Sequence, residues 1–293
     1  MEILVTGGTG FIGEALVPVL CAKGHGVTVL TRQSDPAQIS DARFIQELSQ
    51  LETPIDVVIN LAGASLAAKR WNAAYKDEMV NSRVLLTQRL GEYFRAVEKR
   101  PVIWLNASAI GFYGPRGDET LAESADTGTG FAAELCRDWE AAAKKAAGDA
   151  RLCLMRLGVV LDKEGGAYPQ MAQPFQMGVA NWIGDGEQWL SWVHRDDVVA
   201  AICHAMDNAD VAGAVNVTAP TPVTSRGFCA AMRKVHRTLV AIPMPGVVMR
   251  AMVGEMADEL LITGQKVLPQ ALLSSGFNFT HADIDTALKA IET

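Results

Sequence analysis

The stretch TGGTGFIG, Thr6 to Gly13, follows the apolar run Met1–Val5 and precedes a segment of helical periodicity, Glu14–Lys23, that Gly24 ends. A turn this tight needs residues without a Cβ, and it brings bare backbone N–H groups to a helix N-terminus, where roughly half a positive charge collects. Because the glycines lie between a strand and an amphipathic helix, the stretch predicts a dinucleotide-binding turn. A glycine-rich turn without a ligand is the alternative.

Further short apolar runs recur with room for a helix between them. They are Ile3–Val5, Val27–Leu30, Val57–Leu61, Val102–Leu105 and Leu152–Leu157. Continuous apolar runs are typical of parallel strands covered on both faces by helices, so the pattern predicts an α/β protein with a Rossmann-like, doubly wound parallel sheet. We expect this core in residues 1–165, with later segments returning to it. Residues 166–293, rich in glycine, proline and aromatic residues, are expected to form substrate-enclosing loops and a small C-terminal α/β lobe.

The residues that follow two of these runs indicate the cofactor. The second run ends at Thr31-Arg32. An acidic residue there would bind a ribose 2′-hydroxyl, whereas an arginine pairs with a 2′-phosphate, so Arg32 predicts NADP(H). The alternatives are an ordinary solvated arginine and, more weakly, a ribose contact from Asp35. The third run ends Leu61-Ala62-Gly63, small residues against which the adenosine half of the cofactor can pack.

Composition argues against several other classes of function. The net charge of −7 and the lack of a basic run argue against nucleic acid as a partner. The five cysteines form no CxxC pair and the five histidines show no paired ligand spacing, so we expect reduced thiols and no metal site. No signal peptide and no apolar stretch near ~20 residues is seen, so the expectation is a cytoplasmic protein without a membrane partner.

Four motifs together resemble the extended short-chain dehydrogenase/reductase superfamily: TGGTGFIG, NLAG, ASAIGFYG at Ala107–Gly114, and RLGVVL at Arg156–Leu161. Further residues narrow the resemblance to the atypical extended group often labelled epimerase-family protein and sometimes cell-division inhibitor. These residues are Arg70-Trp71, Ser82-Arg83, Leu135-Cys136 with Trp139-Glu140, Gly165-Gly166-Ala167, Pro174-Phe175, Ser191-Trp192-Val193-His194 with Asp197, and Gly264-Gln265-Lys266. The resemblance runs from Met1 to about Phe279. It implies an NADP-binding Rossmann domain with a small substrate lobe, and no particular substrate.

The resemblance also implies cofactor contacts from Glu78 and Arg83 in the long helix predicted over Asn72–Glu98. Residues five apart do not share a helical stripe, so each can reach a different group, and surface charges are the alternative. The same helix is a candidate homodimer face. The full set of expected cofactor contacts is Gly7, Thr9, Gly10, Phe11, Ile12, Gly13, Thr31, Arg32, Leu61, Ala62, Gly63, Glu78, Arg83 and Val160.

The superfamily's catalytic pair is missing. Its reductases and epimerases use Tyr-x-x-x-Lys on a helix, where the lysine lowers the tyrosine pKa so that the phenol can exchange a proton with substrate. Aligned on the helix that ends Trp139-Glu140, the tyrosine falls near Phe131 or Ala132 and the lysine near Cys136. We interpret Cys136 as a buried apolar residue, with a thiol acid as the alternative.

Two hydroxyls remain as candidate catalytic groups, Ser108 just after the fourth run and Tyr113 five residues further on. Ser108 would polarise a substrate oxygen while Tyr113 or a bound water moves the proton. Ala109 is the alternative match to the superfamily serine, and Tyr113 also fits a structural role. The resulting hypothesis is an NADP(H)-dependent oxidoreductase or epimerase-like enzyme acting on a small carbonyl or hydroxyl substrate. The missing pair favours the alternative, a non-catalytic NADP(H)-responsive sensor.

Two features of the second half of the chain can be explained by structural roles. Asp196 or Asp197 is expected to cap a helix over Val198–Met206, with His194 orienting a loop, so we do not read His194 as a general base. Three tryptophans fit either a substrate-pocket wall or simple packing. They are Trp182, Trp189 and Trp192.

Overall fold

The continuous apolar runs form parallel strands that are buried on both faces. In the computed structural model, which describes residues 1–293, seven parallel strands form one sheet in the order β13-β7-β5-β4-β1-β2-β3. The strands are β1 (Glu2–Thr6), β2 (Gly26–Leu30), β3 (Arg43–Ile45), β4 (Val57–Asn60), β5 (Ile103–Ala109), β7 (Arg151–Leu157) and β13 (Gly213–Val217). All five predicted runs lie in this sheet, so the doubly wound Rossmann-like fold is confirmed. The edge strands β3 and β13 were not predicted.

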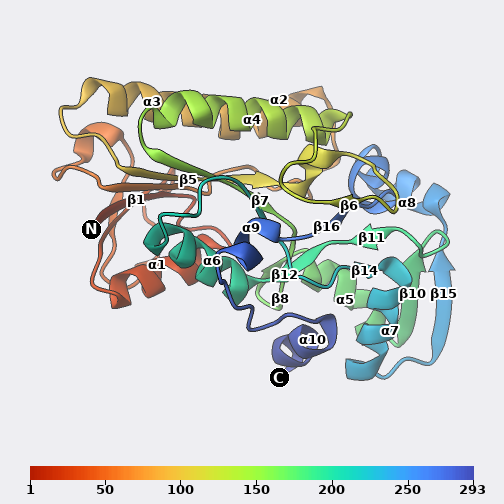
Figure 1. Ribbon diagram of the computed structural model, residues 1–293. Helices are drawn as coiled ribbons and strands as arrows, with labels where there is room; N and C mark the ends of the chain where they lie inside the picture. Colours follow the sequence, from red (N-terminus) through yellow and green to blue (C-terminus); the bar gives the residue numbers. More distant parts are fainter.

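Helices cover both faces of the sheet. Figure 1 shows α3 (Leu86–Ala96) and α4 (Phe131–Ala147) over one face and α1 (Gly13–Ala22) and α6 (Arg195–Asp207) over the other. Side chains alternate along each strand, so neighbours on β1 enter different cores. Ile3 and Val5 pack with the helices α1 and α6, and Leu4 packs with Leu90, Phe94 and Trp104. The carboxyl ends of the strands are thereby left as the accessible edge of the sheet.

The long helix predicted over Asn72–Glu98 forms, with a π-helical turn in its middle. It consists of α2 (Ala73–Val80), the turn η2 (Asn81–Leu85) and α3. Asn72 caps it, because its side chain accepts a hydrogen bond from the Tyr75 backbone N–H at 2.8 Å. A π turn inserts one extra residue into the helix and is common at functional sites. Arg83 lies in this turn.

The second half of the chain builds a separate lobe beside the sheet and also returns to it. Helix α6 and strand β13 belong to the Rossmann core, so the two expected ranges interleave in space. The remaining elements are η1 (Leu48–Gln50), η3 (Ile110–Tyr113), β6 (Thr120–Leu121), β8 (Val159–Asp162), β9 (Gly165–Gly166), α5 (Tyr168–Gln176), β10 (Val179–Ile183), β11 (Trp189–Leu190), β12 (Trp192–His194), β14 (Val223–Thr224), α7 (Ser225–Val235), β15 (Val240–Met244), α8 (Gly246–Val253), η4 (Ala257–Leu261), β16 (Lys266–Val267), α9 (Gln270–Ser274) and α10 (Ile284–Glu292). The lobe has its own core, which includes Trp192, Phe175, Phe228 and Leu288.

Candidate functional site

The strand order reverses between β1 and β4, and a crevice opens there at the carboxyl ends of the strands. Ligands of open α/β sheets bind at this kind of switch point. A cavity of about 1030 Å³ lies at the crevice. It is lined by Gly7, Thr9, Gly10, Leu30, Thr31, Arg32, Gln46, Glu47, Leu48, Ala62, Gly63, Ala74, Asp77, Glu78, Asn81, Ser82, Leu85, Leu86 and Arg89.

The glycine turn holds backbone N–H groups at the edge of this cavity. Gly7 has φ +70°, and a Cβ on it would lie 2.8 Å from the carbonyl carbon of Leu61. A Cβ on Gly13 would lie 2.2 Å from the Gly7 oxygen, so helix α1 can start directly against the turn only without side chains. The N–H groups of Phe11, Ile12 and Gly13 have no acceptor within the chain. Such N–H groups at a helix N-terminus suit a pyrophosphate.

Arg32 lies on the wall of the cavity that follows β2. Its side chain is exposed and makes no hydrogen bond or ion pair with the rest of the chain, whereas Arg89 on the same cavity pairs with Glu47 at 3.4 Å. Thr31 beside it is buried and accepts a hydrogen bond from the Gln33 N–H at 3.2 Å. The guanidinium of Arg32 is therefore available for a bidentate contact with a phosphate.

The structure brings most of the expected cofactor residues to one place. Those that line the cavity are Gly7, Thr9, Gly10, Thr31, Arg32, Ala62, Gly63 and Glu78. Phe11, Ile12, Gly13, Leu61 and Arg83 do not line it but adjoin residues that do. Val160, on β8, does not line it either and lies with Phe11 beside Gly166. The Phe11 ring packs against Gly165, where a Cβ would approach within 2.7 Å. Glu78 Oε2 pairs with Lys69 at 3.2 Å, and its second oxygen makes no hydrogen bond within the chain.

Arg83 is a cation in the crevice without a carboxylate partner. Its Nη2 donates to the Ala64 carbonyl at 2.9 Å and its Nη1 to the Met79 carbonyl at 3.2 Å. The guanidinium lies 5.3 Å from the centroid of the Trp139 ring, and a Cβ on Gly63 would lie 2.8 Å from its Cζ. Burial lowers the pKa of Arg83. From the π turn, the Arg83 guanidinium therefore binds the backbone of the loop after β4 and of helix α2.

The two hydroxyls predicted to be catalytic lie in one buried polar cluster. Ser108 Oγ donates to Glu140 Oε1 at 2.8 Å, and Tyr113 Oη donates to Asn216 Oδ1 at 2.6 Å. Arg156 joins them, since its Nη1 donates to Tyr113 Oη at 2.9 Å and its Nε and Nη2 bind Glu140. Burial raises the pKa of Tyr113, and the Arg156 cation opposes that rise. These contacts favour a positioning role for both hydroxyls over direct contact with substrate.

Helix α4, which carries the tyrosine and lysine in the superfamily, has other residues at those two positions. Cys136 is buried, and burial raises its pKa to about 11, so it is a thiol at neutral pH. The N–H groups of Phe131 and Ala132 donate to the carboxylate of Glu259 at 3.3 and 3.1 Å. Glu259 comes from η4 in the C-terminal lobe. Sequence reasoning missed it because nothing local marks a carboxylate that acts on a helix so distant in the chain.

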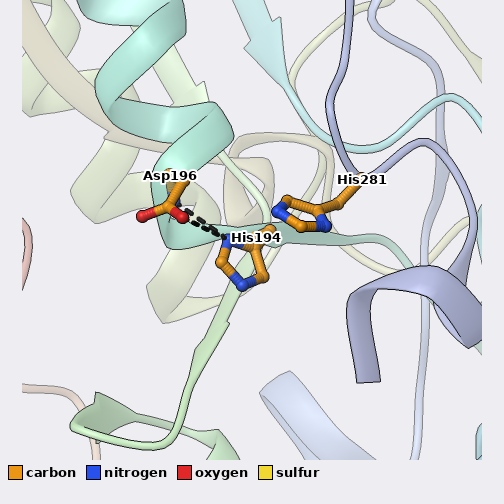
Figure 2. A group of neighbouring side chains, drawn as sticks. All are labelled: His194, Asp196 and His281. Carbon is orange, nitrogen blue, oxygen red and sulfur yellow. Dashed lines mark hydrogen bonds and ion pairs between the residues drawn. The ribbon is translucent and has the colours of Figure 1, made fainter. Parts of the chain in front are cut away.

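The structure also brings His281 next to His194 and Asp196, a neighbour that sequence reasoning did not foresee (Figure 2). His194 is the N-cap of α6, because its Nδ1 accepts from the Asp196 N–H at 3.1 Å. The expected cap by Asp196 or Asp197 is therefore wrong. Asp197 is buried and instead accepts the N–H groups of Thr280 and His281 at 2.8 and 2.9 Å, which fixes the segment that carries His281.

The rings of His194 and His281 stack with centroids 3.9 Å apart and planes tilted by 33°. A metal ion lies in the plane of each imidazole that binds it, whereas these two rings face each other. The helix cap and the ring stack therefore account for this group. Burial lowers the pKa of His194, and the charge of a protonated His281 adds to the effect.

The three tryptophans have different surroundings. Trp192 is fully buried in the core of the C-terminal lobe. Trp182 lies under the Arg226 guanidinium at 4.9 Å, and Trp189 donates to Asp118 Oδ1 at 2.8 Å. Of the two interpretations, a substrate-pocket wall or simple packing, packing therefore applies to Trp192.

The doubly wound sheet, the glycine turn at its switch point and the arginine after β2 define a dinucleotide-binding Rossmann protein of the extended dehydrogenase/reductase type. The comparison with family models is more specific. The chain belongs to the NAD dependent epimerase/dehydratase family, whose model matches residues 3–218. A second model, a domain of unknown function called DUF1731, matches residues 244–291.

Relatives and solved structures cover the whole chain. An epimerase family protein SDR39U1 homolog, chloroplastic, of Arabidopsis thaliana is 37% identical over 99% of this chain and 86% of the relative. Epimerase family protein YfhF of Bacillus subtilis is 35% identical over 99% of this chain and 98% of its own. The crystal structure of human epimerase family protein SDR39U1 with NADPH has a TM-score of 0.89 at 33% identity, covering 100% of this chain and 99% of that one.

Proposed function

We propose that this protein binds NADP(H) at the switch-point cavity and acts as an oxidoreductase or epimerase-like enzyme on a small carbonyl or hydroxyl compound. One observation supports the cofactor above the others. The unpaired guanidinium of Arg32 lines the same cavity whose edge holds the acceptor-free N–H groups of Phe11, Ile12 and Gly13. A 2′-phosphate and a pyrophosphate are the two anionic groups of NADP(H), and these are the two matching donors.

The residues present fit the cofactor. The N–H groups at the start of α1 would hold the pyrophosphate, Arg32 would hold the 2′-phosphate, and Ala62 and Gly63 leave backbone open to the adenosine half. Arg83, half-buried and without a carboxylate partner, adds a cation beside Gly63. When bound, the nicotinamide supplies a site that gives or accepts hydride. Human SDR39U1, which was solved with NADPH, supports the assignment.

Proton transfer in this proposal does not use a tyrosine–lysine pair. Ser108 and Tyr113 remain in it as positioning residues, because their hydroxyls are bound by Glu140, Arg156 and Asn216. They would hold the end of β5 in place beside the substrate. The proton then moves through a bound water, the alternative carrier expected from the sequence.

A second function has an observation in its favour. Cys136 is a buried thiol and both candidate hydroxyls are hydrogen-bonded within the chain, so neither position provides the superfamily's acid–base pair. This supports a non-catalytic sensor that changes its contacts with NADP(H) bound. A screen of carbonyl compounds with purified protein and NADPH distinguishes the enzyme from the sensor. Only an enzyme would oxidise NADPH and lower its absorbance with saturable kinetics.

Substitution of Arg32 tests the cofactor assignment. In Arg32→Ala, we expect NADPH to bind roughly 10- to 100-fold more weakly, since a charge-assisted contact contributes about 1.5–3 kcal/mol. NADH affinity should change little, because NADH has no 2′-phosphate. Arg89→Ala, on the same cavity but paired with Glu47, is the matched control. Equal losses for both nucleotides, measured by titration calorimetry, would remove Arg32 from the proposal.

The compartment is also a proposal. All five cysteines are free, and four of them are buried, which suits a reducing compartment, and we propose the cytoplasm. No helix of the structure combines the length and apolar character that crossing a bilayer requires.

A further inference from the structure

Lys266, on β16, is a half-buried cation without a partner in the chain. Its ammonium makes no hydrogen bond and no ion pair. Six other lysine and arginine side chains are at least partly buried, and each binds a carboxylate or a backbone carbonyl. They are Lys76, Arg83, Arg116, Arg151, Arg156 and Arg195. A charge that leaves water is costly unless it is paired, so the exception at Lys266 indicates an anionic partner from outside the chain.

The backbone around Lys266 is held in place from both sides. The buried hydroxyl of Ser191 donates to the Gln265 carbonyl at 2.7 Å and accepts from the Val267 N–H at 2.9 Å. Successive side chains of a strand point to opposite faces. Because Val267 packs in the cluster that contains Tyr113, the Lys266 side chain points away from that cluster.

The indole of Trp189 forms a wall beside the Lys266 ammonium. Lys266 Nζ lies 4.5 Å from the centroid of the ring. The indole Nε1 donates to Asp118 Oδ1 at 2.8 Å, which fixes the ring. Gly264 allows β16 to approach, because a Cβ there would lie 2.1 Å from the Trp189 carbonyl oxygen. A ring face attracts the ammonium but supplies no negative charge, so the cation is still able to bind an anion.

Strand β16 lies at the carboxyl ends of β5 and β7. Val267 packs against η3, which follows β5 directly. The Ser191 carbonyl accepts from the Val159 N–H at 2.9 Å, at the start of β8, the strand that carries Val160. Figure 1 shows β16, β6 and β11 between the central sheet and the C-terminal lobe. Ligands of such sheets bind at this edge, so the Lys266 ammonium lies on the side where the lobe would enclose a substrate.

We propose that Lys266 and Trp189 bind an anionic group of the substrate, a carboxylate or a phosphate. As a substrate site it rests on the function proposed above, and it narrows the substrate to small carbonyl or hydroxyl compounds that carry such a group. The ammonium binds either anion as a point charge. Partial burial strengthens this ion pair relative to one in open water, and the indole face covers an apolar part of the same ligand. The anion anchors one end of the substrate and leaves the other end for the nicotinamide.

Anion binding can be measured without turnover. Inorganic phosphate and acetate are the probes, each titrated at constant ionic strength into protein saturated with NADPH, which occupies the glycine turn. Proton–nitrogen correlation NMR follows the Trp189 indole N–H, whose signal is identified by its loss in Trp189→Phe. We expect a saturable shift of this signal with phosphate, with acetate or with both, and the probe that causes it identifies the anion.

Substitution of Lys266 tests whether its charge binds the anion. In Lys266→Met the dissociation constant of that probe should rise roughly tenfold or more, because the ammonium is lost. Lys266→Arg keeps the charge and should stay within about threefold of the wild type. Lys289→Met removes an exposed lysine of α10 that has no ion pair, and should match the wild type. No saturable shift with either probe, or an equal dissociation constant in Lys266→Met, would overturn the site.

Matched pairs of neutral and anionic carbonyl compounds test the substrate class in the NADPH oxidation screen. The anionic member of a pair should have the higher kcat/KM by roughly tenfold or more, and Lys266→Met should remove most of this difference by raising KM. Equal turnover of both members, unchanged in Lys266→Met, would overturn the substrate class. A saturable Trp189 shift with no turnover of any compound would instead retain the anion site and reject the enzyme in favour of the sensor.

Discussion

Arg156 and Glu140 form a buried two-pronged ion pair that joins β7 to α4. The Nε–Oε1 and Nη2–Oε2 distances are 2.8 and 3.0 Å, and the side chains are 6% and 3% exposed. The pair also binds the hydroxyls of Ser108 and Tyr113. The residues first expected to act on substrate are thus tied to a structural element that fixes the strand end next to the cofactor crevice.

Removal of one partner of this pair should be costly. Glu140→Ala leaves the Arg156 charge buried without a counter-ion, and we expect a loss of about 3–5 kcal/mol in the free energy of unfolding. Asp138→Asn, on the same helix but in an exposed pair with Arg137, should cost less than about 1 kcal/mol. Urea denaturation at neutral pH measures both. Similar small losses in the two variants would show that the buried pair contributes little.

The glycine turn gives a second prediction. In Gly7→Ala the new Cβ meets the backbone of Leu61 and Ala62 at 2.8–2.9 Å and the residue must keep φ +70°. Gly24→Ala is the matched control, because it has φ +79° with nothing within 4 Å of the new Cβ. Both variants must hold an alanine at positive φ, which costs about 1–2 kcal/mol. Only Gly7→Ala should also lose NADPH binding, measured by calorimetry. Equal binding in both would separate the turn from the cofactor.

The sequence predicts these local features well. The strand, the turn and helix α1 are close in the chain, so the spacing of Gly7, Gly10 and Gly13 and the apolar periodicity are enough to place them. The five central strands follow for the same reason, because burial on both faces leaves a continuous apolar run. The cofactor residues at strand ends could be placed since the carboxyl ends of parallel strands share one edge.

Contacts between distant segments could not be predicted. Nothing near Glu259 marks it as a partner of the α4 N-terminus, and nothing near Ser108 indicates that its hydroxyl faces Glu140 rather than the crevice. On a strand, neighbouring side chains point to opposite faces, so an uncertainty of one residue between Ser108 and Ala109 reverses the assignment. The predicted N-cap of α6 was wrong for a different reason. Histidine is a less common N-cap residue than the aspartates that follow it, so the sequence favoured Asp196 or Asp197 over His194.

The stacked histidines predict a dependence of stability on pH. Burial lowers the pKa of His194 below 6.5, so the unfolded chain takes up its proton first as the pH falls. The stabilisation is complete above the unfolded pKa and is lost as the pH drops from about 6.5 toward the folded pKa, by at most about 1.4 kcal/mol per pH unit. His194→Asn keeps an N-cap oxygen and should reduce this slope between about pH 7.5 and 5.

The slope should not vanish in that variant, because burial also lowers the pKa of His25. His25→Asn serves as the comparison, since it removes one titrating group and leaves the α6 cap intact. Urea titrations between about pH 7.5 and 5 measure how the free energy of unfolding depends on pH in the wild type, His194→Asn and His25→Asn. An unchanged slope in His194→Asn would mean that the stacked pair does not govern the acid sensitivity.

Glu259 gives the last prediction, on how the C-terminal lobe is held against the site. Its carboxylate is bound by two N–H groups at the start of α4, and the contact depends on Gly130, where a Cβ would lie 2.6 Å from the carboxylate. A carboxylate at a helix N-terminus contributes about 0.3–2 kcal/mol, so Glu259→Ala should speed amide exchange in residues 246–264 by roughly 2- to 30-fold. NADPH affinity should be unchanged, because Glu259 does not line the cavity. Glu255→Ala removes only the half-exposed pair with Lys76 and should have a smaller effect. Equal exchange in the two variants would show that the helix terminus does not hold the lobe in place.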